Sequence, residues 1–437
     1  MAFSIKGIHI PHRKNTAGMS AVRMPAPSSV TLLTAMHIGK PAKPIVKVGD
    51  QVMVGTLIAE QDGFVSVPIY SSVSGTVKNI SDYTSSNGNT APAITIESDG
   101  LMTVDSLVIP PQINSKEDFI EAIRKSGIVG LGGAGFPTHV KFATDKKIDT
   151  LVINGAECEP YITSDSITMT EKAEDILFAI ETADKYFNFD QIVIGIERNK
   201  KSAIAKIKEA TAKNSKIKVM VLESTYPQGG EKVLVYRTIG RIIKAGQLPA
   251  DVGCIVSNTS TMANLAKFIK TGMPLVEKII TVDGGAVKEP KNVTVAIGTP
   301  LADVFEFCGG FTGEPQKVLY GGPMMGVAVP DLSAPVLKQT NAILALSSKE
   351  TKTAKTTACI KCGKCTNSCP FGINPAAIAK AYNNKDVELV EKLGVETCML
   401  CGCCAYVCPA KRPLVDTNNL AKKMLAADRA KKREGNA

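Results

Sequence analysis

The sequence of 437 residues predicts a multidomain protein that combines α/β and all-β units and ends in a helical, cysteine-rich domain. Short apolar runs with glycine turns fill residues 40–100, helical and strand patterns alternate over residues 115–260, and two dense cysteine runs lie within residues 359–409. The length also favours several domains over one. We therefore expect domains at 1–112, 113–275, 276–345 and 346–437.

The composition is that of a folded protein, with 44% hydrophobic residues and a net charge of +10. No uncharged apolar stretch reaches the length of a transmembrane helix. Residues 1–6 contain no signal-peptide core, so a cytoplasmic location is expected. The C-terminal end is basic, which is compatible with binding to an anionic membrane, to nucleic acid or to an acidic partner. The plainer alternative is a solvated helix end. No nucleic-acid-binding module is recognisable, so nucleic acid is not an expected partner.

The evenly spaced strand patterns of residues 40–100 predict a small sandwich or barrel. The phrases V-x-x-G-D and S-G-T-V in this stretch resemble biotinyl- and lipoyl-type domains. Such domains present a lysine at a hairpin tip, but the matching stretch here, residues 67–71, contains none. We therefore expect a scaffold or docking role rather than a swinging carrier.

The α/β region begins with a predicted helix at 116–126, for which Ser115 is the expected N-cap. Helices predicted at 171–186 and 200–212 alternate with strands, as a parallel sheet requires. Residues 130–137 read G-L-G-G-A-G-F-P, and such a glycine-rich loop lets backbone amides approach a phosphate or a flavin. This order departs from the G-x-G-x-x-G dinucleotide fingerprint.

Polar residues follow the strand predicted at 150–153, including Glu157 and Glu159. Open α/β sheets bind ligands at the carboxyl ends of their strands, so these side chains are candidates for contacts with a nucleotide. A solvated loop is the plainer alternative.

The cysteine runs at 359–370 and 398–409 both read C-x₂-C-x₂-C-x₃-C-P. This is the bacterial ferredoxin spacing for [4Fe–4S] clusters, in which the fourth cysteine of each run ligates the other cluster. The predicted ligand sets are Cys359, Cys362, Cys365 and Cys408 for one cluster, and Cys398, Cys401, Cys404 and Cys369 for the other. Tetrahedral zinc needs no interlocked runs, and disulfides suit short secreted proteins. Cys403 is out of frame and is expected to be a spare thiol.

Four motifs in sequence order resemble the flavoprotein subunit of respiratory complex I: G-L-G-G-A-G-F-P, N-G-A-E-C-E-P, Y-P-Q-G-G-E-K and S-N-T-S-T. Residues 279–311 resemble the ubiquitin-like SLBB module of that flavoprotein. With the N-terminal β domain and two cluster motifs, the whole arrangement is similar to the RnfC family, which belongs to the Rnf complex, a membrane ferredoxin:NAD⁺ oxidoreductase. The resemblance implies a Rossmann-like α/β domain that binds FMN and NAD(H).

The resemblance also implies roles for individual residues. FMN would be surrounded by the glycine loop and Lys141, held by Asn154 and Glu157, and contacted through its phosphate or ribityl chain by Asn258 and Thr259. Phe136 and Glu159 would contact NADH. Lys141, Glu159 and Glu231 would act in hydride exchange. The full implied cofactor-binding set is Gly130, Gly132, Gly133, Gly135, Phe136, Lys141, Asn154, Glu157, Glu159, Tyr226, Gly229, Gly230, Glu231, Asn258 and Thr259.

Three positions depart from the complex I pattern: Leu131 replaces an arginine, Ala156 an aspartate and Gly230 a glutamate. The resemblance nevertheless implies a peripheral protein at the cytoplasmic face of the membrane, held by the Rnf subunits A, B, D, E and G, that meets ferredoxin only indirectly. A soluble cobalamin reductase of the propanediol-utilisation type is the alternative enzyme. A scaffold whose flavin site is inactive is the non-enzymatic alternative.

Overall fold

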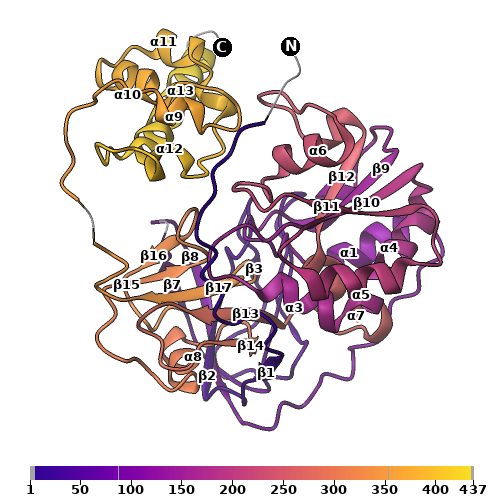
Figure 1. The fold of residues 1–437 in the computed structure, drawn as a ribbon. Coiled ribbons are helices and arrows are strands. Elements are labelled where there is room, and N and C mark those ends of the chain that lie inside the picture. The colour runs from indigo at the N-terminus through magenta and orange to yellow at the C-terminus, as the bar shows by residue number, and fades with distance from the viewer. Residues whose placement is uncertain (1–4, 87, 353, 435–437) are drawn as a thin grey trace.

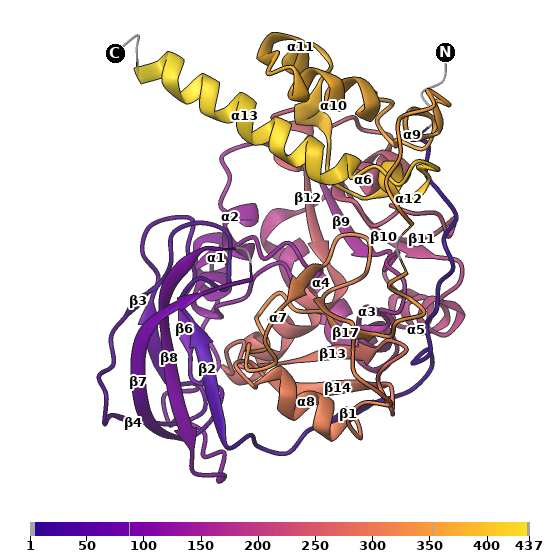
Figure 2. The same cartoon turned by 90° about the vertical axis from the view of Figure 1, so that its left-hand side faces the viewer.

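The first folded unit consists of two small packed sheets, with strand orders β2-β8-β7-β4 and β3-β5-β6 (Figure 2). Their apolar side chains, such as Val30, Ile58 and Ile94, are fully buried between the sheets. The bounds are β2 (Ser29–Leu33), β3 (Lys43–Pro44), β4 (Gln51–Val52), β5 (Leu57–Glu60), β6 (Ile69–Tyr70), β7 (Gly75–Thr84) and β8 (Thr90–Ser98). Residues 67–71, which the lipoyl resemblance placed at an exposed tip, are largely buried, and the longest hairpin is β7–β8.

The second unit is a four-stranded parallel sheet in the order β11-β10-β9-β12 with helices packed against it (Figure 1). Ser115 and Asp118 form a reciprocal capping box at the start of its first helix, as the sequence predicted for the cap. The elements are α1 (Lys116–Lys125), α2 (Thr138–Phe142), β9 (Thr150–Gly155), α3 (Ser164–Glu171), α4 (Ala173–Phe187), β10 (Gln191–Glu197), α5 (Lys201–Thr211), β11 (Ile217–Leu222), α6 (Glu231–Ile239), the 3₁₀ helix Pro249–Val252, β12 (Cys254–Asn258) and α7 (Thr259–Thr271).

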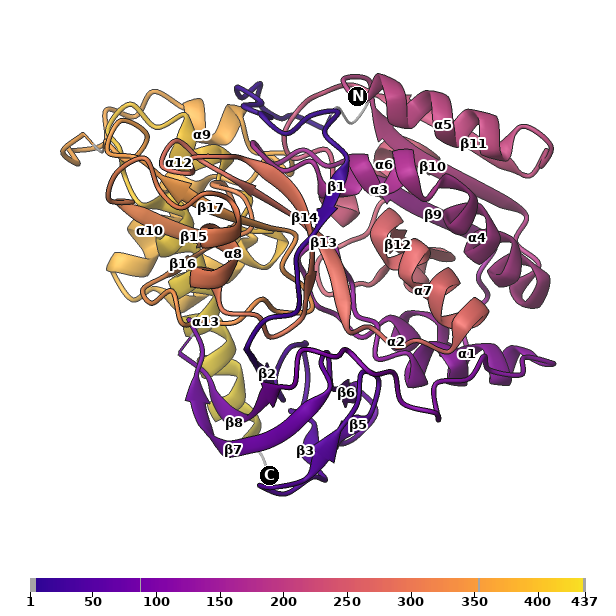
Figure 3. The ribbon, with the colours of Figure 1, turned by 90° about the horizontal axis from the view of Figure 1, so that it is seen from below.

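The third unit is a six-stranded mixed sheet, in the order β1-β14-β13-β17-β15-β16, with one helix. Its edge strand β1 comes from the N-terminal segment and pairs in parallel with β14 (Figure 3). The elements are β1 (Ala21–Arg23), β13 (Glu277–Asp283), β14 (Lys291–Ala296), α8 (Leu301–Phe307), β15 (Lys317–Tyr320), β16 (Val327–Val329) and β17 (Ala342–Leu346).

The N-terminal segment does not belong to the β-rich unit that the sequence analysis assigned to residues 1–112. Ile8 forms a backbone bridge with Tyr226 of the second unit, and β1 completes the sheet of the third. The segment thus runs along two other units before the chain enters its first sheet at Ser29. This computed structural model describes residues 5–86, 88–352 and 354–434.

The fourth unit is helical and contains both cysteine runs (Figure 1). Ile378, Val390 and Leu425 form its apolar core. Its elements are α9 (Lys364–Asn367), α10 (Pro375–Asn383), α11 (Val387–Lys392), the 3₁₀ helix Val395–Thr397, α12 (Cys403–Tyr406) and α13 (Leu414–Glu434). In the part of the chain that the structure describes, no helix has the length and apolar character needed to cross a membrane.

A buried lysine joins three of the units. The Nζ atom of Lys338 donates to the carbonyls of Pro68 and Gly127, each at 2.7 Å. Burial lowers the pKa of Lys338 to about 7. These hydrogen bonds compensate for the burial of the ammonium group and fix the first and second units against the third, around the cavity described next.

Candidate cofactor sites

A cavity of about 470 Å³ lies at the carboxyl ends of β9 and β12. Most of the predicted cofactor-binding residues line it: Gly130, Gly132, Gly133, Lys141, Asn154, Glu157, Glu159, Tyr226, Gly229, Gly230, Glu231 and Asn258. The lining does not include Gly135, Phe136 or Thr259, and Thr259 is fully buried. Most residues that the resemblance assigned to the cofactors therefore lie together at one cavity, whereas their binding roles stay predictions.

The glycine loop forms one wall of this flavin cavity. It is closed by hydrogen bonds from the Gly130 N–H to the Phe136 carbonyl at 2.8 Å and from the Gly135 N–H to the Gly130 carbonyl at 3.1 Å. Gly133 has φ +113°, a conformation that side chains with a Cβ rarely adopt. A Cβ on Gly132 would lie 3.1 Å from Asn258 Nδ2. The loop thus leaves room for a ligand to approach its backbone, which fits a flavin.

An ion pair lies on another part of the wall. Lys141 Nζ is 2.9 Å from Glu231 Oε2 and donates to the Val256 carbonyl at 3.0 Å. Lys141 belongs to α2 and Glu231 opens α6, so the pair brings two predicted site residues together from separate elements. The side chains are 24% and 39% exposed, which leaves both within reach of a bound molecule.

The loop after β9 places two carboxyl groups at the cavity. Glu157 Oε1 accepts from the Asp165 N–H at 2.7 Å, while its buried Oε2 atom has no hydrogen-bond partner among the described residues and lies 3.8 Å from Lys14 Nζ in an ion pair. Glu159 accepts from the Met324 N–H at 3.1 Å, and its Oε1 atom lies 3.3 Å from the Tyr226 hydroxyl oxygen. Burial raises the pKa of both carboxyl groups, that of Glu159 to about 7. The orphaned Glu157 oxygen is a position where a donor group of a ligand fits.

Sequence reasoning missed Lys14, which holds this loop from the N-terminal segment. Its Nζ donates to the carbonyls of Glu157 and Glu159, both at 3.1 Å, and to that of Ile162. Lys200 supports the same loop by donating to the Glu157 carbonyl at 3.0 Å. No local pattern marks Lys14, because its partners lie more than 140 residues away.

Asp165 is a second residue that was missed. It lines the cavity and accepts from Asn258 Nδ2 at 2.7 Å and from the Ser260 hydroxyl at 2.5 Å. Asn258 is also the N-cap of α7, since its side chain accepts from the Thr261 N–H. The side chain of Asn258 is therefore held in place on both sides. Other lining residues come from the β7–β8 hairpin and the third unit, namely Ser85, Ser86, Gly321, Gly322 and Asn341.

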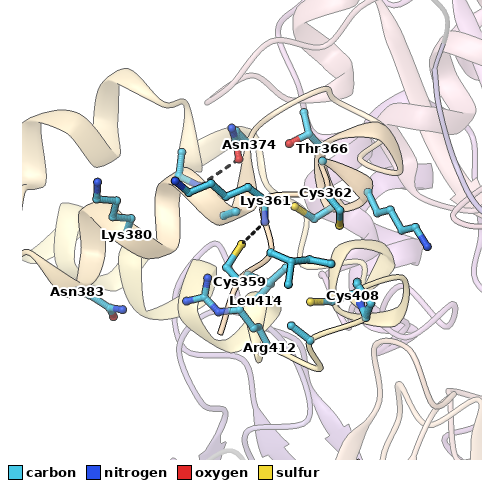
Figure 4. Close-up of a pocket in the computed structure, with 18 of the residues that line it drawn as sticks. Cys359, Lys361, Cys362, Thr366, Asn374, Lys380, Asn383, Cys408, Arg412 and Leu414 are labelled. Carbon is cyan, nitrogen blue, oxygen red and sulfur yellow. Dashed lines mark hydrogen bonds between the residues drawn. The ribbon is translucent and has the colours of Figure 1, made fainter. Parts of the chain in front are cut away.

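The eight predicted cluster ligands gather in two groups of four. Cys359, Cys362, Cys365 and Cys408 line one cavity of about 470 Å³ (Figure 4), and Cys369, Cys398, Cys401 and Cys404 line a second, narrower one. Each group combines three cysteines of one run with the fourth of the other, as the ferredoxin pattern requires. Four thiols in each cavity form a donor set that fits an iron–sulfur cluster. Ligation itself stays a prediction.

Over the described ranges, no three cysteine, histidine or acidic side chains converge closely enough to hold a single metal ion. Cys403 also lines the second cavity and directs its thiol to the Tyr226 carbonyl at 3.8 Å.

The second cluster cavity adjoins the flavin cavity. Met399 lines both, and the Tyr226 hydroxyl donates to the Cys401 carbonyl at 2.6 Å. In the first cavity, by contrast, Cys359 and Cys362 are exposed at the surface. The two cysteine sites therefore differ in position, one beside the flavin cavity and the other toward solvent.

Comparison with known proteins agrees with this architecture. Four protein-family models match this chain: the RnfC barrel sandwich hybrid domain over residues 3–101, the Nuo51 FMN-binding domain over 123–267, the SLBB domain over 279–328 and the 4Fe-4S dicluster domain over 352–409. The chain is 42% identical to the C subunit of the Na⁺-translocating ferredoxin:NAD⁺ oxidoreductase complex of Acetobacterium woodii, covering 97% of both chains. The chain belongs to the RnfC family.

Two further comparisons bear on this RnfC-family chain. It is 38% identical to the C subunit of the ion-translocating oxidoreductase complex of Rhodobacter capsulatus, over 99% of this chain and 85% of that protein. An NAD⁺-reducing [NiFe]-hydrogenase structure matches with a TM-score of 0.50 and 16% identity, over 72% of this chain and 61% of that one, which speaks for the fold alone. The predicted fold class, the FMN-binding domain and the two-cluster domain are confirmed.

We expect Lys14→Met in this RnfC-family chain to lower the free energy of unfolding by about 1–3 kcal/mol, because buried carbonyls lose a charged donor. Flavin content should fall with it, since the loop of Glu157 and Glu159 loses its support. Urea unfolding and flavin release would measure both effects. Lys40→Met is the control, because Lys40 pairs with Asp62 while 66% exposed and surface pairs contribute about 0–1 kcal/mol. Equal effects of the two changes would contradict a role for Lys14.

Proposed function

We propose that this chain is the NAD(H)-reacting component of a membrane-bound, ion-translocating ferredoxin:NAD⁺ oxidoreductase. It exchanges hydride between NAD(H) and FMN and passes single electrons between the flavin cavity and partner subunits through two [4Fe–4S] clusters. The observation that carries the proposal is the contact between the flavin cavity and the Cys398 site: Met399 lines both, and Tyr226 of the flavin cavity donates to the Cys401 carbonyl. The names of the related proteins support it.

FMN would supply the conversion between two-electron and one-electron chemistry, and the protein would bind and orient the reactants. The glycine loop would receive the flavin at its backbone, with Lys141 and Glu231 at its side. Glu159 and Tyr226 would meet the nicotinamide end, where the hydrogen bond from the Met324 N–H keeps the carboxyl group of Glu159 in place. Glu157 would accept a donor of the flavin through its Oε2 atom, which forms no hydrogen bond within the described residues and has only the ion pair with Lys14 at 3.8 Å.

The proposed location is the cytoplasmic face of the membrane, where partner subunits hold the chain peripherally. Those partners are the other Rnf subunits, A, B, D, E and G, and ferredoxin is reached through them. The relatives' names favour this function over the cobalamin reductase alternative. A flavin-binding chain that reacts with NADH would also exclude the scaffold alternative.

The test of the flavin site is a pair of substitutions, Lys141→Ala and Glu231→Ala. Each removes a charged partner from the cavity wall, so we expect NADH oxidation by the flavin-loaded chain to fall about tenfold or more. Lys146→Ala is the matched control, because Lys146 pairs with Asp251 and does not line the cavity. Stopped-flow bleaching of the flavin by NADH gives the rate. Unchanged rates in both cavity variants would contradict the assignment.

The raised pKa of Glu159 predicts a pH dependence. An ionised carboxylate near the nicotinamide stabilises the positive charge that forms as NADH becomes NAD⁺, so NADH oxidation should increase as pH rises through about 7. Glu159→Gln should lose this inflection, whereas Glu209→Gln, a change on exposed α5, should keep it. A wild-type profile without an inflection from about pH 5.5 to about pH 8.5 would contradict the role of Glu159.

A further inference from the structure

The cavity formed by Cys359, Cys362, Cys365 and Cys408 has a basic rim. Lys361, Lys364, Lys380 and Arg412 line it, and no aspartate or glutamate does. Figure 4 shows the labelled basic side chains Lys361, Lys380 and Arg412 on one side of the sulfur atoms of this site, with Lys380 farthest from them. The sequence extends the pattern, since residues 351–385 contain six lysines and no acidic residue. We call Lys361, Lys364, Lys380 and Arg412 the basic rim.

The basic rim has no carboxylate partners among the described residues, although Arg412 forms a side-chain hydrogen bond with the Cys359 thiol. Among the described residues, none of its four cations forms an ion pair. The basic end of α13 differs, because Arg429 pairs with Glu391 and Glu396, and Lys432 pairs with Asp428. Positive charge that the chain leaves unpaired is therefore placed around the exposed cysteine site.

The rim also has the other features of a surface for electron exchange. Ile360 lies between Cys359 and Cys362 in the sequence, lines the same cavity and is 69% exposed, which gives an apolar contact beside the basic rim. Cys359 and Cys362 are exposed beside it, so a partner can come close to the site. A small apolar centre within complementary charges suits brief, oriented encounters, because long-range attraction raises the association rate without a large buried area.

We propose that the basic rim is the docking surface for an acidic electron-transfer protein or domain that carries its own redox group. The proposal rests on the proposed function and adds the contact surface and the charge of the partner. Negative carboxylates of the partner would pair with Lys361, Lys364 and Lys380 and would bring its redox group next to the Cys359 site.

The test uses the intact complex with the triple change Lys361→Glu/Lys364→Glu/Lys380→Glu in this chain. NAD⁺-dependent oxidation of reduced ferredoxin by the complex should fall at least about tenfold at low ionic strength, and its dependence on salt should become shallower. Carbodiimide treatment of the wild-type complex should link Lys364 or Lys380 to carboxylates of another protein of the complex. The matched control is Lys201→Glu/Lys208→Glu/Lys213→Glu, the same charge change at exposed lysines of the second unit.

Flavin bleaching by NADH and iron content are measured in the same preparations. Normal flavin bleaching together with slow ferredoxin oxidation in the triple variant supports the docking surface. Absence of flavin bleaching in the wild type would refute the proposed function, and the cross-linking result would then decide whether the basic rim is a docking surface. If the triple variant loses iron, the single variant Lys380→Glu is tested in its place, because Lys380 belongs to α10 and lies outside the cysteine runs. Unchanged rate and salt dependence would overturn the proposal. So would loss of binding to phosphatidylglycerol vesicles without loss of electron transfer, which would assign the rim to lipid.

Discussion

Cys369→Ala is expected to remove the irons bound at Cys398, Cys401 and Cys404 and to leave those at Cys359, Cys362 and Cys365. Cys369 lies in the cavity of the second group although its sequence belongs to the first run. A cubane that loses one thiolate loses a covalent ligand, so the iron content should fall from about eight to about four per chain. Because the Cys398 site adjoins the flavin cavity, electron exchange between NADH and partner subunits should stop as well.

Two companion variants make this result specific. Cys408→Ala should give the reverse pattern, since Cys408 lies with the Cys359 group. Cys403→Ala is the matched control, because Cys403 lines the same cavity as Cys404 but falls outside the ligand spacing, and it should keep both clusters. Iron analysis with low-temperature electron paramagnetic resonance distinguishes the two clusters. Loss of the Cys359 cluster alone in Cys369→Ala would refute the crossed ligand sets.

The grouping of the cysteines was predictable from sequence because the chemistry fixes the spacing. Three thiolates on one cluster need short sequence gaps between their cysteines, and the fourth comes from a second run. The cysteine spacing within residues 359–408 therefore indicates both ligand sets. The capping box at Ser115 was predictable for a similar reason, since an N-cap serine is a local requirement of the helix backbone. The motifs of the flavin cavity were found by resemblance, and most of their glycines do lie on its wall.

The remaining parts of the site depend on contacts between distant segments, which leave no local pattern. Strand β1 has three residues and no alternation of buried and exposed side chains, yet it completes a sheet with β14. In the sequence alone Lys14 looks like any surface lysine, because its contact with the loop of Glu157 arises only when the N-terminal segment packs beside that loop in the fold. Ser85 and Ser86 reach the cavity because β7 and β8 form one long hairpin, where the sequence indicated two short separate strands.

The isolated chain should reduce ferricyanide with NADH, because the proposed flavin and nicotinamide sites lie on one polypeptide. It should not reduce ferredoxin with NADH to any substantial yield. The reduction potentials of low-potential ferredoxins are about −400 mV, below that of the nicotinamide couple, so electron transfer from NADH to ferredoxin is uphill. An ion gradient across the membrane of the intact complex can supply the difference, and an assay of the isolated chain in solution contains no such gradient.

Two anaerobic assays of the reconstituted chain test this limit. Ferricyanide reduction by NADH should be lost in Lys141→Ala and kept in Cys403→Ala, which ties the activity to the flavin cavity. Ferredoxin reduction, followed by its visible absorbance, should stay at background in all three proteins. If the isolated wild type reduced ferredoxin in high yield, with NADH as sole electron donor and no other energy source, the membrane-coupled function would be refuted. Such a yield would need a second, coupled acceptor that takes one downhill electron for each electron given to ferredoxin, and the expected enzyme would then be a soluble bifurcating oxidoreductase.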